Sequence, residues 1–463
     1  MNLTSDIPNK FINPEDALDN GKRGKNAYLR HLAFQGEKNR YPELMGEVSE
    51  RLNFELQVIE KIGYPEYFLI VQDFMSVARR MRAFVGPGRG SAAGSLVNYC
   101  LGITNVDPIK HNLLFERFLN PARISIPDID IDFEEEGKKS VIQYLIRKYG
   151  SNQVAQIMTY KTETIKYIVH PSGTELEGSF RNAVLRAGGV IIAPNDIRQF
   201  FSEPLLKDSE MWCTPLDAEE AESAGLLKMD FFDLKSLSLI KEALKIIKNS
   251  HRIELIPDYF PLEDELTYQL FQRGETEDVF QFESTEMQNY LRELKPTKFS
   301  DLVAIIALYR PGSINYIPSF IKLKHEVETI TYDLEGMDKV LSETYGMTIY
   351  QEQVMLLSQK LADFTKGESD VLRKAMAKKQ MEVLDIMLPM FIENGKKNGH
   401  NENKLIKVWN DWKVFAPYAF NKSHATCYSM IAYQTAHLKA HYPLEFRDSV
   451  LRSNKSDIKS EKS

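Results

Sequence analysis

Asp128, Asp130 and Asp132 alternate with isoleucine within the stretch Arg123–Phe133. Alternation with a period of two is typical of a β-strand, so all three carboxylates are expected on one face. Such carboxylates, ~6.6 Å apart along the strand, could converge on two divalent cations, as in metal-assisted phosphoryl transfer. A solvent-exposed strand face explains the pattern less well, because aspartate is depleted in strands. The stretch therefore predicts a metal site.

A glycine-rich segment, Ala83–Leu96, precedes these aspartates. Its glycines allow a close backbone approach, Ser91 is a candidate helix cap, and the free N–H groups of a helix N-terminus attract phosphate. The segment matches neither the P-loop nor the dinucleotide-binding pattern, and alone it would be explained by a tight turn. Together with the aspartates, it favours metal-assisted phosphoryl transfer from a nucleotide.

Further charged residues follow later in the chain. The segment Gly225–Leu234 is a second acidic strand candidate, with Lys228 and Asp230 on one face. Basic residues gather in Arg373–Lys379 and again near Lys422. A basic run is usually a solvated helix face, but it is also what a triphosphate or a nucleic-acid backbone requires.

The composition sets limits on the class of protein. A chain of 463 residues, 43% apolar and 27% charged, is typical of a globular protein with two or three domains. The three cysteines form no Cys-x-x-Cys pair, which argues against structural zinc and disulfides. No apolar run suits a membrane span and the N-terminus lacks a signal-peptide pattern, so a cytoplasmic location is predicted. The net charge of −7 is weak evidence against DNA binding.

Seven segments, in this order, resemble the bacterial replicative DNA polymerase III alpha subunit, the C-family polymerases. They are Gly86–Ser95, Leu113–Pro121, Pro127–Phe133, Ala307–Gly312, Tyr350–Met355, Phe420–Ala425 and Ala432–Thr435.

The resemblance implies an α+β chain, in which a DNA polymerase beta-like nucleotidyltransferase palm with a mixed sheet precedes mostly helical fingers. It also implies that Asp128, Asp130 and Asp230 are catalytic and hold two Mg²⁺ ions, while the role of Asp132 is left open. Asp130 would bridge both ions, and Asp230 would hold the ion that activates the primer hydroxyl. The implied nucleotide-binding residues are Gly90, Ser91, Gly94, Ser95, Arg310, Arg373, Lys374 and Lys422.

The same comparison predicts the domain limits. Residues 1–25 are expected to be a leader or remnant, 26–248 the palm, 249–451 the fingers and 452–463 a disordered tail. Residues 161–178 are expected to be a short linker where the family has a thumb. The PHP domain and the C-terminal clamp-binding and OB regions of the family are not matched.

The leading hypothesis is a DNA-directed DNA polymerase core that transfers deoxynucleotides to a primer 3′-hydroxyl during replication. Its expected partners are primer-template DNA, deoxynucleoside triphosphates and other replisome subunits, with no membrane. Without a thumb, extension is expected to be short and salt-sensitive. Two alternatives stay open: a catalytically weak or inactive DNA-binding or assembly fragment, and a non-templated nucleotidyltransferase.

Overall fold

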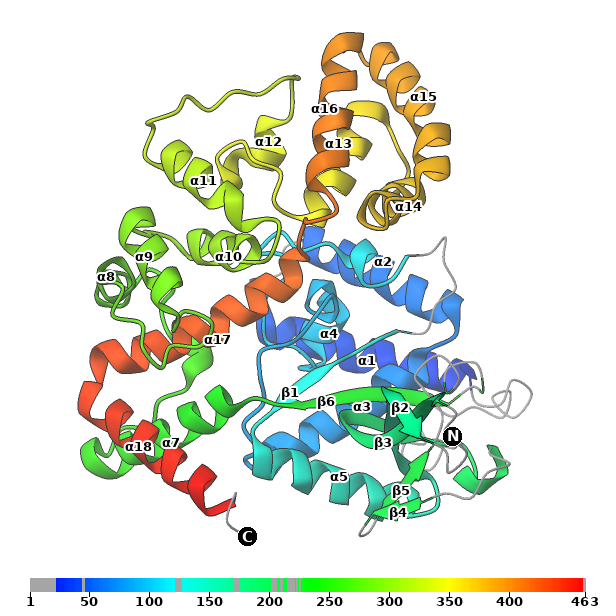
Figure 1. Cartoon of the computed structure of the whole chain (residues 1–463), viewed down its shortest axis with the longest axis vertical. Helices are drawn as coiled ribbons and strands as arrows, with labels where there is room; N and C mark the ends of the chain where they lie inside the picture. Colours follow the sequence, from blue (N-terminus) through cyan, green and yellow to red (C-terminus); the bar gives the residue numbers. More distant parts are fainter. Residues whose placement is uncertain are drawn as a thin grey trace. The chain divides into compact units, whose positions relative to one another are not determined.

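The chain forms two compact units. Figure 1 shows the helices and strands of both. The computed structural model describes residues 22–43, 46–120, 127–169, 175–200, 206–208, 211–214, 221, 224 and 226–460. The first unit comprises Met1–Leu29, Pro65–Val85 and Asp128–Leu234, and the second comprises Arg30–Tyr64, Gly86–Pro127 and Lys235–Ser463. Helix α1 (Lys22–Arg40) runs from one unit into the other. Within the described ranges, no helix is long and apolar enough to span a bilayer.

The first unit is built on a mixed sheet with the strand order β1-β6-β3-β2-β5-β4. Its strands are β1 (Ile131–Phe133), β2 (Val154–Val169), β3 (Glu175–Ile192), β4 (Leu206–Asp208), β5 (Met211–Thr214) and β6 (Leu227–Asp233). The pairs β1–β6 and β2–β5 are parallel, whereas β6–β3, β3–β2 and β5–β4 are antiparallel. The short β1 is the edge strand beside β6.

Helices α3 (Pro65–Arg80) and α5 (Glu135–Tyr149) belong to the same unit and contact each other. The 3₁₀ helix η5 (Ile197–Phe200) follows β3. Phe231 of β6 lies 5.4 Å from Phe74 of α3 and 5.3 Å from Phe133 of β1, measured between ring centroids. These buried aromatic contacts hold α3 against the β1–β6 edge of the sheet.

Strands β2 and β3 form a long antiparallel hairpin, which the sequence analysis did not predict. Residues 161–169 continue β2 and residues 175–178 begin β3, so these parts of the predicted 161–178 linker are strand. Residues 170–174, where a turn was predicted, lie outside the described residues. The segment alternates lysine and glutamate with β-branched threonine and isoleucine, a composition that favours strands despite its polarity.

The second unit is helical. Its elements are α2 (Gly46–Ile62), η3 (Ala92–Gly94), α4 (Leu96–Cys100), η4 (Phe115–Arg117), α7 (Lys235–His251), η6 (Pro257–Tyr259), α8 (Glu265–Arg273), α9 (Thr285–Leu294), α10 (Phe299–Leu308), η7 (Ile314–Tyr316), α11 (Ile317–Lys324), α12 (Asp338–Leu341), η8 (Ser342–Thr344), α13 (Gln351–Ala362), α14 (Lys366–Ala377), α15 (Met381–Lys397), α16 (Glu402–Phe415), α17 (Lys422–His441) and α18 (Pro443–Ser460). The mixed sheet and the helical region together confirm the predicted α+β class.

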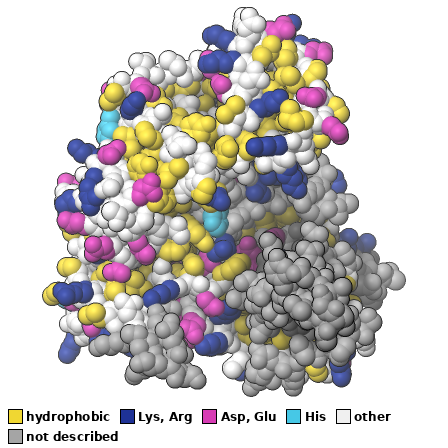
Figure 2. All heavy atoms as spheres, in the orientation of Figure 1, with side chains coloured by type: hydrophobic (Ala, Val, Ile, Leu, Met, Phe, Trp, Pro, Cys, Tyr) yellow, Lys and Arg dark blue, Asp and Glu magenta, His cyan; other side chains and the backbone are white. Residues whose placement is uncertain are grey.

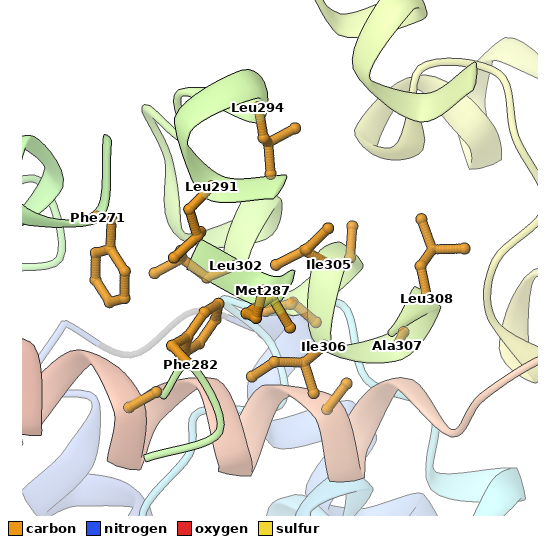
Figure 3. Close-up of a cluster of buried hydrophobic side chains, with 14 of the residues drawn as sticks. Phe271, Phe282, Met287, Leu291, Leu294, Leu302, Ile305, Ile306, Ala307 and Leu308 are labelled. Carbon is orange, nitrogen blue, oxygen red and sulfur yellow. The ribbon is translucent and has the colours of Figure 1, made fainter. Parts of the chain in front are cut away.

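Two apolar clusters hold the helices of this unit. In the first, side chains of α8, α9 and α10, among them Phe271, Met287 and Ile306, converge beside α17 (Figure 3). In the second, Phe391 packs against Trp409 and Trp412 with ring centroids 5.3 Å apart in both pairs. Helix α17 is buried around most of its circumference, which agrees with its weak polar–apolar asymmetry.

The predicted ends of the chain need correction. Residues 22–25, assigned to a leader, begin α1, and Lys25 pairs with Glu66 of α3 at 2.8 Å. Residues 452–460, assigned to a disordered tail, belong to α18. Arg452 anchors this part of the helix, because its guanidinium bonds Glu242 of α7 at 3.0 Å and Asp448 at 2.7 Å. Residues 1–21 and 461–463 lie outside the described residues.

The boundary between the two units also falls earlier than predicted. The sheet unit ends at Leu234, and α7, which was assigned to the palm up to residue 248, belongs to the helical unit. Helix α7 packs along α18 and α17, both in the helical unit. On the face seen in Figure 2, the described Lys and Arg side chains are interspersed with Asp and Glu, in keeping with a net charge of only −7.

Candidate active site

Strands β1 and β6 give the acidic residues a common face. The parallel register pairs Asp132 with Phe232, and side chains on neighbouring positions of paired strands point to the same side. Asp132 therefore shares a face with Lys228 and Asp230, which lie four and two residues before Phe232 along β6. The opposite face of both strands carries the buried phenylalanines of the core. The predicted placement of Lys228 and Asp230 on one face is confirmed.

Strand β1 is shorter than predicted. It covers only Ile131–Phe133, so Asp128 and Asp130 precede the strand, and residues 121–126 lie outside the described residues. The backbone N–H of Ile129 donates to the Tyr67 hydroxyl at 3.1 Å instead of to a neighbouring strand. Asp128 is exposed and Asp130 is partly buried, whereas Asp132 on the strand is buried.

Lys228 connects the aspartates that are distant in sequence. Its ammonium nitrogen lies 3.2 Å from Asp230 Oδ2 and 3.8 Å from Asp128 Oδ1. Burial opposes the charge of this lysine, but the carboxylates of Asp128, Asp230 and Asp130 outweigh it and raise the pKa of Lys228. Asp128 and Asp230 thus lie within 4 Å of one ammonium, and the charge of Asp130 also acts on it.

Tyr67 of α3 faces the same three carboxylates. Burial is the main cause that raises the pKa of its hydroxyl, and the negative charges of Asp128, Asp130 and Asp230 add to it. Because the hydroxyl accepts the N–H of Ile129, it also fixes the backbone between Asp128 and Asp130. Sequence analysis missed this residue, since its aromatic and apolar surroundings predict only a core position.

The donor set fits Mg²⁺, which prefers carboxylate oxygen ligands. Lys228 already occupies the position of a counter-cation among these carboxylates. In the described residues, Asp128, Asp130 and Asp230 do not bring oxygen atoms within 4.8 Å of one another. Sites with two ions, about 3.5–4 Å apart, distribute their carboxylates over a wider space than a single ion does. The arrangement is therefore compatible with the predicted pair of ions.

The glycine-rich segment lies in the helical unit. Gly90 has φ +62, a conformation that favours glycine, and its N–H donates to Nδ1 of His424 at 3.1 Å. Arg89 donates to the Tyr428 hydroxyl at 2.7 Å. Gly90 and Ser91 are partly exposed, so both backbone positions are accessible to a ligand.

Glu55 occupies the helix N-terminus that was predicted to attract phosphate. Its buried carboxylate accepts hydrogen bonds from the hydroxyl of Ser95 at 2.8 Å and from the N–H of Val97 at 3.0 Å. Ser95 also caps α4 by accepting the N–H of Asn98, whereas Ser91 makes no side-chain cap. The predicted capping by Ser91 is wrong, because α4 begins after Ser95.

Gly94 is required for close packing. A β-carbon at this position would lie 2.5 Å from the carbonyl oxygen of Leu114. Its own carbonyl accepts a hydrogen bond from Arg51 of α2 at 2.7 Å. The glycine and serine at 94 and 95 are therefore buried in the fold of this segment, and their predicted contact with a nucleotide remains a prediction.

Two of the predicted phosphate-binding cations share one carboxylate. Arg373 and Lys374 of α14 both contact Asp370, with Arg373 Nε at 3.0 Å and Lys374 Nζ at 2.6 Å. Burial opposes the charge of Asp370, but Arg373 and Lys374 outweigh it and lower the pKa of this carboxyl. Asp370 thus positions both cations and offsets part of their charge.

The other two predicted cations also have partners. Lys422 is 6% exposed and its ammonium donates to Glu343 at 2.6 Å. The guanidinium of Arg310 lies 4.3 Å from the ring centroid of Phe420 in a cation–π contact. The sequence signals identified these cations but not the two carboxylates: Asp370 lies on α14 beside Arg373 and Lys374, and Glu343 lies far from Lys422 in sequence.

Comparison with known proteins agrees with these motifs. Residues 27–173 and 163–233 match the family model described as the bacterial DNA polymerase III alpha NTPase domain. Residues 236–399 match the one described as the bacterial DNA polymerase III alpha subunit finger domain. The two ranges of the first match overlap at residues 163–173, and the two family models meet close to the boundary between the compact units.

Several curated relatives are DNA polymerase III alpha subunits. That of Aquifex aeolicus is 38% identical over 99% of this chain and 46% of the relative. That of Thermus aquaticus is 38% identical over 93% of this chain and 41% of the relative, and that of Escherichia coli O6:H1 is 38% identical over 97% and 44%. The chain spans less than half the length of these relatives.

Proposed function

Because this chain belongs to the bacterial DNA polymerase III alpha family, we propose that it is the palm-and-fingers core of a DNA-directed DNA polymerase. The proposed reaction is the template-directed transfer of a deoxynucleotide from its triphosphate to a primer 3′-hydroxyl. The observation that carries the proposal is the meeting of Asp128, Asp130 and Asp230 around Lys228 and the Tyr67 hydroxyl.

Asp128, Asp130 and Asp230 would hold two Mg²⁺ ions. When bound, such ions activate the attacking hydroxyl and stabilise charge on the departing pyrophosphate. Asp230 is fixed by its place on β6 and by Lys228, so its carboxylate needs little reorganisation to bind a cation. Tyr67 holds the backbone at Ile129 and thereby orients the carboxylates on either side of it.

Lys228 also offsets negative charge in the proposed site. Three carboxylates close together repel one another, and its ammonium lowers that repulsion while no metal is bound. The side chain is 9% exposed, which reduces the screening of its charge by water. Gly90, Ser91, Arg310, Arg373, Lys374 and Lys422 remain the candidates for contacts with the triphosphate, and Gly94 and Ser95 support the backbone beside them.

Primer extension by the full chain tests the proposal. With Mg²⁺, low salt and a primer-template duplex, the unaltered chain should add the nucleotide that the template specifies. Asp130→Asn should reduce the rate by at least about 10³-fold, because a neutral amide is a poor ligand for Mg²⁺. Circular dichroism should show an unchanged fold.

Asp233→Asn is the matched control. Asp233 ends β6 on the opposite face, where it pairs with Lys138 at 2.8 Å, and its change should leave the rate within about twofold. Equal extension by Asp130→Asn and the unaltered chain would refute the catalytic assignment. Extension without regard to template would instead favour a non-templated nucleotidyltransferase, and DNA binding without any extension would favour an inactive binding fragment.

A further inference from the structure

Two histidines and an aspartate lie together in the helical unit, outside the proposed polymerase site. His437 and His441 are one helical turn apart on α17, and Asp264 immediately precedes α8. His441 Nε2 is 2.9 Å and His437 Nδ1 is 3.7 Å from Asp264 Oδ2. One ligand atom from each residue lies within 4.8 Å of the others. The polymerase mechanism uses none of the three.

This spacing is close to what one small cation requires. Zinc bonds to imidazole nitrogen and carboxylate oxygen are about 2.0–2.1 Å long, so ligand atoms of a tetrahedral site are about 3.3–3.5 Å apart. The observed separations from Asp264 lie on either side of that range. Small side-chain rotations, without movement of the helices, would bring the three atoms to tetrahedral separations.

Surrounding contacts hold Asp264 and the segment before α8 in place. The backbone N–H of Thr267 donates to Asp264 Oδ2 at 2.8 Å, and the Thr267 hydroxyl donates to the same oxygen at 2.6 Å. The Tyr433 hydroxyl, one turn before His437, accepts the N–H of Asp264 at 3.2 Å and donates to the carbonyl of Pro261 at 2.6 Å. The chain before α8 is therefore fastened to α17. Outer contacts of this kind orient the ligands in established metal sites.

The ring of His437 packs against the ring of Phe260. Its centroid lies 4.2 Å from that of Phe260, and the residue is 8% exposed. His441 is exposed, with its ring centroid 4.2 Å from that of His437. The cluster thus has a buried side and an open side, so that a water molecule could complete the coordination of a bound ion.

We propose that Asp264, His437 and His441 form a site for one divalent transition-metal ion, such as Zn²⁺, which clamps the start of α8 to the last turn of α17. Two nitrogen donors and a single carboxylate favour Zn²⁺ over Mg²⁺, which prefers oxygen ligands. The proposed clamp is therefore distinguishable from the catalytic ions by metal preference. It adds a stabilising contact within the helical unit and takes no part in nucleotide transfer.

Zinc titration of the full chain tests the proposal. After treatment with a chelator, the chain is titrated calorimetrically with Zn²⁺ in excess Mg²⁺, which occupies oxygen-only sites. One Zn²⁺ per chain should bind, and Co²⁺ should give the visible absorption of a four-coordinate ion with nitrogen ligands. Zinc should also raise the melting temperature. His437→Gln and His441→Gln should each weaken Zn²⁺ binding by more than about tenfold and abolish that rise.

His251→Gln is the matched control. His251 also pairs with a carboxylate, Glu445 at 2.7 Å, but has no second histidine in the same cluster, so its change should leave Zn²⁺ affinity unaltered. His441 is exposed, so His441→Gln remains informative if His437→Gln does not fold. Failure to bind Zn²⁺ in excess Mg²⁺, or equal binding by both cluster variants and the unaltered chain, would overturn the proposal and leave only an Asp–His ion pair. Neither result depends on primer extension.

Discussion

The ammonium of Lys228 lies 3.2 Å from the carboxylate of Asp230, two residues further along the same strand. Both side chains are buried, at 9% and 4% exposure, and Asp128 approaches the same ammonium from the segment before β1. A lysine among the proposed metal ligands must either move or share their charge when a cation binds.

Lys228→Met should increase the affinity for Mg²⁺ by about tenfold. Removing a positive charge a few ångströms from the carboxylates favours cation binding by about 1–2 kcal/mol after screening. In the absence of metal the variant should be less stable than the unaltered chain, because three carboxylates then lack this counter-charge. The measurement is the rise in melting temperature as Mg²⁺ is added. The control is Lys138→Met, a buried lysine paired with Asp233 on the other face, which should respond to Mg²⁺ as the unaltered chain does.

Tyr67→Phe should slow primer extension and lower the free energy of unfolding by about 1 kcal/mol. The change leaves the N–H of Ile129 buried without its acceptor and loosens the backbone between Asp128 and Asp130. Chemical denaturation and single-turnover extension measure the two effects. Tyr144→Phe removes a hydroxyl that donates to Asp73 at 2.6 Å, away from the aspartates, and should leave extension unchanged. Equal extension rates for the two variants would contradict the orienting role of Tyr67.

Glu55→Ala should lower the free energy of unfolding by about 3 kcal/mol. Burial raises the pKa of Glu55. Its carboxylate nevertheless accepts hydrogen bonds from the Ser95 hydroxyl, the Val97 N–H and the Arg51 guanidinium. Truncation to alanine would leave these three donors without their acceptor. Urea denaturation measures the change. Glu60→Ala, on the same helix, removes a more exposed pair with Arg30 and should cost less than about 1 kcal/mol. Similar losses of unfolding free energy for Glu55→Ala and Glu60→Ala would refute the conclusion that Glu55 stabilises the N-terminus of α4.

The stability of the helical unit should fall as the pH drops from 7 to 5, in part through His424. Burial, with the nearby charges of Arg89 and Arg310, lowers the pKa of His424 to about 4. An unfolded histidine, with its ordinary pKa near 6.5, takes up a proton in this range while the folded one does not. Protonation therefore favours the unfolded chain by about 2 kcal/mol at pH 5, and no such loss occurs above pH 7.

His424→Asn is the variant that isolates this effect. Its amide oxygen can still accept the Gly90 N–H but does not titrate, so the unfolding free energy should depend less on pH by about the same 2 kcal/mol. Urea denaturation at several pH values gives the comparison. Parallel pH profiles for the variant and the unaltered chain would show that His424 does not titrate in this way.

Local patterns in the sequence predicted part of the fold and of the site. The period of two places Lys228 and Asp230 on one face of β6, because side-chain direction in a strand depends only on the spacing of residues. The same rule failed at Asp128 and Asp130, where the Ile129 N–H bonds to a tyrosine instead of a neighbouring strand. The β2–β3 hairpin was missed because its polar residues outweighed the β-branched ones in the interpretation.

Partners from distant parts of the chain could not be predicted. Tyr67 resembles any aromatic core residue in its sequence context, and nothing near Glu55 indicates that it binds the N-terminus of α4. Asp370 is an exception, because it lies three residues before Arg373 on α14, a helical spacing that the sequence could have indicated. Glu343 is one acid among many, and only packing makes it the partner of Lys422. Hydrogen bonds and ion pairs of this kind depend on long-range contacts, which have no fixed spacing in the sequence.

The sequence by itself determined which chemistry this protein can offer: the aspartates, the glycine-rich segment and the order of the polymerase motifs. It did not determine which groups meet. Only the tertiary structure, by laying β1 parallel to β6, brought Asp128 and Asp230 to a single ammonium and placed Tyr67 against both. The physical reason is that strand pairing is a long-range interaction, whereas residue type and periodicity are local.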